Sequence, residues 1–416
     1  MNKWINIGRD YLSRLNFLSF LVLLAALPFP LPIIRVCWAV WCFSWLAELR
    51  FLHRENFRPD KAAVYLSAGV AVWLVWNIIS VFWAADTHTA WNYVGRYCSL
   101  LPIPLIGLFG VNQYYDWKLC VKVLLISALI SVGVYLFTYF WFINRHFLYD
   151  KHVELQTVDW WHVDDLLLNI KHRMHYTNLL CMLFPCLVLF RRQIGNLFAL
   201  IAGLILLVAV ILTGSRVALI SLSLIAVSTL TWCLLRYRAR WIQITGVCIA
   251  ALLLFGSVGS VLFFHPRNEG MDEPRLAIWQ TALEQPTDYL TRGLGAGNAT
   301  NYLVSKYEAR GLEEPALYQY SPHNQFLGVC MDLGLPAALL FVLFWMGIPL
   351  FFHGITRYWS VCVCAVCACA MMTDMLLSGL EGLVFVVVMT IFAYLSNNPR
   401  NSGCGLPDNS CINGSN

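Results

Sequence analysis

Three short segments of this chain carry residue types that can bind a phosphate and move a proton. Arg216 ends the sequence Thr-Gly-Ser-Arg at 213–216, and Arg275 lies in a second polar segment. A guanidinium presents a planar fork of donors that fits phosphate oxygens, so two arginines at one site predict a clamp for a phosphate or pyrophosphate. His323, within Pro-His-Asn-Gln-Phe-Leu at 322–327, is the residue type that transfers protons near neutral pH.

Each of these residues also has an ordinary structural explanation. An arginine at the end of a membrane helix often extends to the lipid headgroups as an anchor, which would account for Arg216. A solvated helix face would account for Arg275, and a single histidine such as His323 is by itself a weak indication of catalysis. The residue types alone leave these alternatives open.

Further residues near the three are candidates for holding substrate. The polar side chains that we expect to contact substrate are Ser215, Asn324, His172, Arg173 and Asp332. Asp332, Asp374 and Glu381 are expected near the outer ends of apolar runs, where they would pair with the arginines or hold an acceptor. The G-x-G-x-G sequence at 293–297 follows no predicted strand, so it indicates a flexible loop rather than a dinucleotide site.

The elements that must position these residues belong to a chain too apolar for a soluble protein. Of its 416 residues 59% are hydrophobic and 12% are charged, whereas soluble domains carry about 25% charged residues. Only helices satisfy their own backbone groups within a bilayer of ~30 Å, so the apolar runs predict an all-α integral membrane protein of about twelve transmembrane helices. The expected spans are 16–31, 33–49, 62–84, 91–110, 119–143, 174–190, 195–213, 217–235, 242–264, 325–352, 358–378 and 382–396.

Lysine and arginine in the short connections predict the orientation of these spans. Sixteen such residues fall on one side and three on the other, so we expect both termini in the cytoplasm and the net charge of +5 to orient the chain rather than bind nucleic acid. The cytoplasmic set is Lys3, Arg9, Arg14, Arg50, Arg54, Arg58, Lys61, Lys118, Lys122, Arg191, Arg192, Arg236, Arg238, Arg240, Arg357 and Arg400, and the opposite set is Arg35, Arg96 and Arg216.

Two long connections then fall outside the cytoplasm, at 144–173 and 265–323. The second is expected to be a large, partly helical periplasmic loop in which Ile278, Trp279, Ala282 and Leu283 recur at helical spacing, which predicts an amphipathic helix lying on the membrane face. The domains that follow are spans one to nine in 1–264, the periplasmic loop 265–323 with catalytic residues, the last spans in 324–396, and a cytoplasmic tail 397–416.

The cysteines do not indicate a metal site. Cys362, Cys364, Cys367 and Cys369 are spaced C-x-C-x-x-C-x-C within an apolar run that contains no nearby histidine or carboxylate. This setting favours small packing residues of a membrane helix. We therefore expect neither a metal nor another cofactor.

The order of the motifs resembles the O-antigen ligase and O-antigen polymerase superfamily. The matching features are Thr-Gly-Ser-Arg at 213–216, R-x-x-x-W-x-x-A-L at 275–283, the glycines at 293–297 and Pro-His-Asn-Gln-Phe-Leu at 322–327, followed by Asp332 and Gly334. They cover roughly 170–350, and the span number and the large late loop extend the resemblance to the whole chain. The family pattern more often has glutamate at the position of Asp332.

The resemblance implies a membrane glycosyltransferase of the GT-C type that uses neither a nucleotide sugar nor a metal. Its donor would be a glycan on undecaprenyl diphosphate, taken at the periplasmic face of the bacterial inner membrane. Arg216 and Arg275 would bind the diphosphate, and His323 would activate the acceptor. Because the diphosphate is already a good leaving group, we expect a single displacement with inversion at the anomeric carbon.

We expect an O-antigen ligase that transfers a preassembled glycan to a lipid A-core acceptor, with membrane lipids as its surroundings. An O-antigen polymerase or a protein O-oligosaccharyltransferase would use the same donor with another acceptor, which the sequence does not identify. A transporter or flippase also fits twelve spans. That class places charged or broken-helix features near the bilayer midplane, whereas the charges here are expected at outer helix ends.

Overall fold

The structure is a computed structural model that describes residues 2–49, 59–149, 173–234 and 272–396, and all secondary structure in these ranges is helical. The predicted all-α class is therefore confirmed for the described residues. The long helices of the bundle are α1 (Asn2–Ala26), α2 (Leu31–Leu49), α3 (Lys61–Ser80), α6 (Trp117–Tyr149), α8 (Arg173–Ile194), α9 (Asn196–Leu212), α10 (Arg216–Leu234), α17 (Gly354–Thr373) and α18 (Leu380–Ser396).

Six helical segments of the described residues are long and apolar enough to cross a membrane. Three further apolar helical segments are shorter. The six are Leu31–Leu49, Lys61–Trp83, Trp117–Trp141, Arg173–Arg191, Arg216–Leu234 and Gly354–Thr373, and the shorter ones are Asn196–Leu212, Leu335–Leu350 and Leu380–Tyr394. A multi-pass membrane protein follows from these helices, while the predicted total of twelve spans is not established by them.

Two of the predicted spans are wrong as continuous helices. The span 91–110 is divided into α4 (Thr87–Tyr97), a 3₁₀ turn and α5 (Pro102–Phe109), and Pro102 begins α5 because proline lacks the N–H that an interior position needs. The span 325–352 is divided at Gly334, which has φ +87° and separates α15 (Gln325–Leu333) from α16 (Leu335–Gly347).

The first of the two long connections predicted to lie outside the cytoplasm begins later than expected. Helix α6 continues through Tyr149, so the first residues of the predicted loop 144–173 are helical. The rest of that loop up to residue 172, the predicted span 242–264 and the tail 397–416 lie outside the described residues.

Residues 272–323 form a small helical unit with a core of its own. It contains α12 (Asp272–Leu283), a 3₁₀ turn at Pro286–Asp288, α13 (Ala299–Arg310) and α14 (Glu313–Leu317). Ile278 and Ala282 are buried against α13 and against Met331 of α15. The expectation that α12 lies with its apolar face on the membrane is therefore wrong for these two residues, because that face packs against protein.

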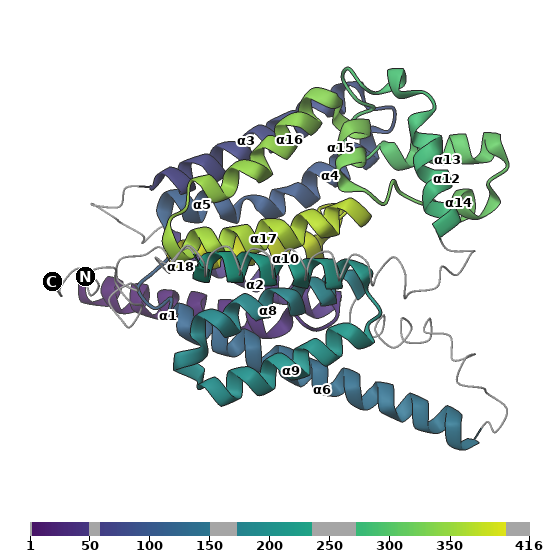
Figure 1. The fold of residues 1–416 in the computed structure, drawn as a ribbon. Helices are drawn as coiled ribbons and strands as arrows, with labels where there is room; N and C mark the ends of the chain where they lie inside the picture. The colour runs from purple at the N-terminus through teal and green to yellow at the C-terminus, as the bar shows by residue number, and fades with distance from the viewer. Residues whose placement is uncertain (1, 50–58, 150–172, 235–271, 397–416) are drawn as a thin grey trace.

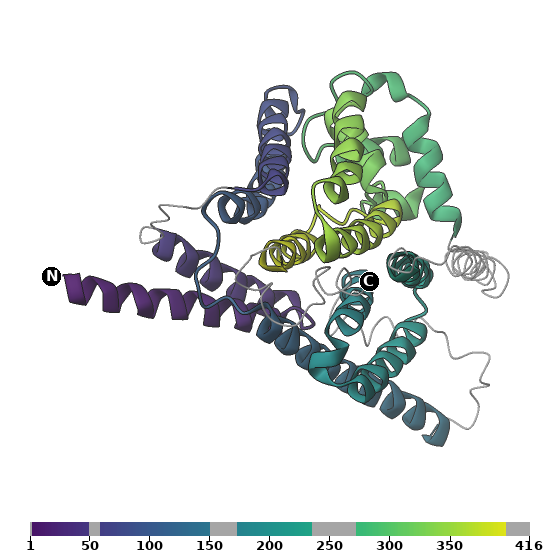
Figure 2. The ribbon, with the colours of Figure 1, turned by 60° about the vertical axis from the view of Figure 1, so that its left-hand side comes forward.

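The helices alternate in direction, so their connections gather at two ends of the bundle (Figures 1 and 2). The beginning of α1 and the end of α18 lie at one end, and the unit 272–323 lies at the other. The starts of α8 and α10 lie at the same end as this unit. The fold therefore collects the candidate residues at one end, and the assignment of that end to the periplasm stays a prediction.

The glycine-rich segment joins the small unit to the bundle. Leu294 N–H donates to the carbonyl oxygen of Met331 at 2.9 Å, and Gly295 N–H donates to that of Asp332 at 2.8 Å. Gly295 has φ +95°, and a Cβ on it would lie 2.6 Å from Cα of Ala84. The segment is thus closely packed, and the expected flexible loop is wrong because the glycines allow this close backbone approach.

A second junction lies at the α3–α4 corner. The amide of Asn298 accepts from the N–H of Asp86 at 2.9 Å and donates to its carbonyl oxygen at 3.2 Å. The Asp86 carboxylate caps α4, and the hydrogen bonds from Thr89 hold the pKa of Asp86 below its ordinary value. The small unit is therefore attached to the helices through directed polar contacts as well as packing.

Candidate active site

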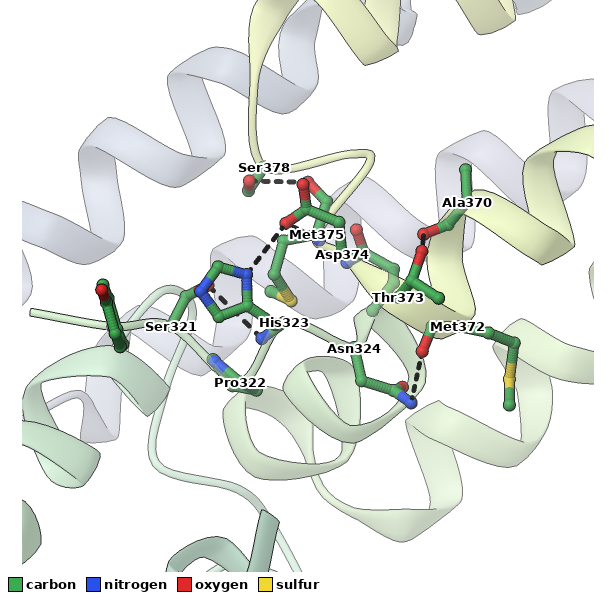
Figure 3. A network of polar contacts seen from close by, with 12 residues as sticks. Ser321, Pro322, His323, Asn324, Ala370, Met372, Thr373, Asp374, Met375 and Ser378 are labelled. Carbon is green, nitrogen blue, oxygen red and sulfur yellow. Dashed lines mark hydrogen bonds and ion pairs between the residues drawn. The ribbon is translucent and has the colours of Figure 1, made fainter. Parts of the chain in front are cut away.

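His323 lies in an unusual backbone conformation directly before α15. Its φ is +45°, in the left-handed region that side chains other than glycine rarely adopt. Figure 3 shows the imidazole turned toward Asp374, and Nδ1 lies 3.4 Å from Oδ1 of that carboxylate. With Nδ1 at Asp374, Nε2 is the ring nitrogen available to a reacting group.

Asp374 is held in place by the end of α17. It is the residue after the helix, in extended conformation, and its Oδ1 accepts from the N–H of Met375 at 2.7 Å. About 25% of its side chain is exposed, compared with 31% for His323. The pair is thus neither sealed in the core nor fully hydrated, as a site that receives substrate from outside requires.

The two residues after His323 fix its distance from Asp374. Asn324 caps α15 through the N–H of Leu327 at 3.0 Å, and its Nδ2 donates to the carbonyl oxygen of Met372 at 3.2 Å (Figure 3). The next side chain, Gln325, is fully buried and accepts from the N–H of Leu377 at 2.8 Å. Asn324 therefore clamps α15 to the end of α17, while its expected contact with substrate stays a prediction.

Arg275 is carried by a helix that contacts the histidine segment. It is exposed and lies on α12 one turn before Trp279, so the two side chains share a face. The indole of Trp279 donates to the carbonyl oxygen of Pro322 at 2.9 Å. This hydrogen bond places the face of α12 that bears Arg275 against the residue that precedes His323.

Arg216 reaches the same level of the bundle through the packing of α10 on α17. The two helices run in opposite directions, and the hydroxyls of Thr229 and Tyr358 lie 2.6 Å apart. Arg216 is thirteen residues before Thr229, and Met371 is thirteen residues after Tyr358. At a rise of ~1.5 Å per residue, both lie ~20 Å along their helices from that contact. Arg216 is therefore level with Met371, one turn before Asp374.

The remaining candidates fall into different surroundings. The buried hydroxyl of Ser215 accepts from the N–H of Ala218 at 3.3 Å, which caps the start of α10. Arg173 is half-buried at the start of α8, and His172 lies outside the described residues. Asp332 is 5% exposed and accepts from the N–H of Ala299 at 2.7 Å, beneath the glycine-rich segment. Asp332 thus positions that segment, and its expected role in holding substrate stays a prediction.

Two carboxylates near helix ends lie beside histidines, and their expected pairing with the arginines stays a prediction. Asp374 pairs with His323, and Glu381 of α18 lies 3.8 Å from Nε2 of His175 on α8. The sequence marks both carboxylates only by their position at the ends of apolar runs. No motif links Asp374 to His323, so this partnership emerges only from the packing of α15 against α17.

Together these residues supply what a transfer at a phosphate-bearing carbon needs. An imidazole with a carboxylate on its far nitrogen can take a proton from a hydroxyl, and the carboxylate stabilises the imidazolium that forms. Guanidinium groups stabilise the negative charge on a phosphate that leaves. The structure places the histidine, its carboxylate and the two elements that carry the arginines at one end of the bundle.

Residues 201–342 match the O-antigen ligase family. This segment includes Arg216, Arg275 and His323, whereas Asp374 lies beyond it. No curated protein matches the chain. The resemblance to the O-antigen ligase superfamily is confirmed for these residues by this match.

Proposed function

We propose, from the O-antigen ligase match and the pairing of His323 with Asp374, that this chain is an O-antigen ligase. It transfers a preassembled glycan from undecaprenyl diphosphate to a lipid A-core acceptor at the periplasmic face of the inner membrane. The observation that carries the proposal is the 3.4 Å contact between His323 Nδ1 and Asp374, because it leaves one imidazole nitrogen for the acceptor.

The reaction is a single displacement. Nε2 of His323 takes the proton of the acceptor hydroxyl while its oxygen attacks the anomeric carbon of the donor glycan. The bond from this carbon to the diphosphate oxygen breaks, and undecaprenyl diphosphate leaves with that electron pair. Arg216 and Arg275 bind the diphosphate oxygens and stabilise the charge that develops on them. The anomeric configuration is inverted because only one displacement takes place.

An apolar cavity supports a substrate with a hydrocarbon chain. It measures about 330 Å³ and lies among α3, α16, α17 and α18, where its lining is almost entirely apolar. One lining residue, Leu377, belongs to the connection between α17 and α18 that also carries Asp374. Leu377 therefore links the cavity to the segment that carries Asp374, which supports a substrate with an apolar chain.

Reconstitution with defined acceptors tests the reaction. Proteoliposomes holding the chain and a polyprenyl-diphosphate glycan are supplied with lipid A-core, and we expect label in lipid A-core with inverted anomeric configuration by NMR. Lengthened lipid-linked repeats in vesicles without lipid A-core would instead identify a polymerase. Retention of configuration would contradict the single displacement, and label in a supplied acceptor protein would identify a protein O-oligosaccharyltransferase.

Asp374→Asn tests the role assigned to the carboxylate. Asparagine keeps the size of the side chain but not its negative charge, so His323 loses the group that orients it and stabilises its protonated form. We expect kcat for transfer to fall, by up to about 10²-fold, as misplacement of a catalytic group causes. The measurement is initial rates in proteoliposomes at equal protein insertion. An unchanged kcat would remove Asp374 from the mechanism.

A further inference from the structure

The rings of Tyr318, Tyr320 and His323 form a row that begins at the protein surface. The rings of Tyr318 and Tyr320 are stacked with 5.9 Å between centroids and 17° between planes. Tyr320 meets the imidazole of His323 edge to face, at 5.7 Å and 74°. About 31% of the His323 side chain is exposed, so the imidazole remains accessible beside the tyrosines.

The backbone of this segment is strained on both sides of Tyr320. Gln319 has φ +50° and His323 has φ +45°, and they are the two residues other than glycine with positive φ in the described parts of the chain. Such conformations cost free energy and persist only where surrounding contacts enforce them. The two conformations flank the segment in which Tyr320 lies against the imidazole.

Several hydrogen bonds fix the position of Tyr320. Its hydroxyl donates to Oε1 of Glu314 at 3.0 Å, and its carbonyl oxygen accepts from the hydroxyl of Tyr307 at 3.4 Å. The Tyr318 side chain, by contrast, lies at the surface, where 64% of the residue is exposed. The Tyr318 ring thus presents an apolar face to its surroundings, and it stacks on Tyr320, whose position is fixed by hydrogen bonds.

We propose that Tyr318 and Tyr320 form a subsite that stacks against a pyranose ring of the glycan acceptor. The inference rests on the proposed function, since the acceptor hydroxyl is the group that His323 activates. A pyranose has a face of C–H groups, which fits the negative face of an aromatic ring. Its hydroxyls lie around the rim, where Glu314 and His323 can bond to them. The tyrosines therefore select a sugar and direct its hydroxyl to the base.

The alternative for an exposed tyrosine in a membrane protein is an anchor in the lipid interface. That role requires only an amphipathic ring at the correct depth. It does not require stacking on Tyr320 or strain at Gln319 and His323. The two roles differ in what a truncation of Tyr318 changes, because an anchor affects membrane insertion and a subsite affects the acceptor.

The test is the acceptor dependence of the Tyr318→Ala variant. With saturating polyprenyl-diphosphate glycan and increasing lipid A-core, we expect KM for lipid A-core to rise roughly three- to tenfold. We expect kcat to stay within about a factor of two, because His323 and Asp374 are untouched. Tyr318→Phe keeps the stacking ring and should restore the KM. Leu317→Ala, which truncates a neighbour that is even more exposed, should leave both constants unchanged.

Binding without turnover separates this inference from the proposed function. In a His323→Ala background, saturation-transfer NMR with released core oligosaccharide should show contact with the protein that is lost when Tyr318→Ala is added. An unchanged KM for lipid A-core, a rise in the KM for the donor instead, or a loss of membrane insertion would overturn the subsite. Continued transfer by His323→Ala alone would overturn the proposed function, whatever Tyr318 does.

Discussion

His323→Ala is expected to abolish measurable glycan transfer while the protein still inserts and folds. The imidazole is the proposed general base, and a positioned base contributes typically about 10²–10⁴ in rate. About 31% of the histidine side chain is exposed, so its truncation should leave little empty space in the interior of the protein. Initial rates in proteoliposomes at equal protein amount measure the effect.

A matched control is available at the other end of the bundle. His353 is exposed at the start of α17 and its side chain makes no capping hydrogen bond. His353→Ala should therefore transfer glycan at the rate of the unaltered chain. Transfer by His323→Ala at a comparable rate would show that this residue is not the base.

The helical class and most long helices follow from the sequence because apolar runs of that length have one stable form in lipid. The divided spans do not, and Gly334 illustrates the reason. A Cβ there would lie 2.7 Å from the carbonyl oxygen of Thr291, so its conformation is imposed by a segment more than forty residues earlier. The pattern of apolar residues within 325–352 does not indicate that contact.

The candidate site, like the fold, is only partly predictable from the sequence. The types of Arg216, Arg275 and His323 indicate phosphate binding and proton transfer, and their motifs place them in one family segment. The carboxylate partner of His323 is not indicated, because Asp374 lies fifty-one residues later and is brought near by the packing of α15 on α17. Local chemistry is therefore predictable, whereas partners across the fold are not.

Asn324 shows how one residue type serves two interpretations. Beside a catalytic histidine, an amide indicates substrate binding, yet asparagine is also among the preferred residues at the start of a helix. In the structure its Oδ1 caps α15 and its Nδ2 bonds to Met372 of α17. The sequence gives no means of choosing between these roles, because both fit an asparagine directly before a helix that is expected to begin at residue 325.

Substitution of the two arginines is the second large effect that we expect. Arg216→Ala and Arg275→Ala should each lower kcat/KM for the polyprenyl-diphosphate donor by about 10²–10³, the typical effect of removing one donor to developing charge. Lysine at either position keeps the charge but lacks the planar fork that binds two oxygens at once. Arg216→Lys and Arg275→Lys should therefore retain more activity than the alanine variants and less than the unaltered chain.

The double variant decides whether the two guanidiniums bind one diphosphate. Residues that act on one group are not additive, so Arg216→Ala with Arg275→Ala should lose less than the product of the single losses. Arg310→Lys is the control, because Arg310 lies in the same small unit and its guanidinium bonds to Thr281 and Glu284. Independent losses would place the arginines at separate sites. Normal transfer by both single variants would exclude the clamp and leave His323 to act on a donor held by other residues.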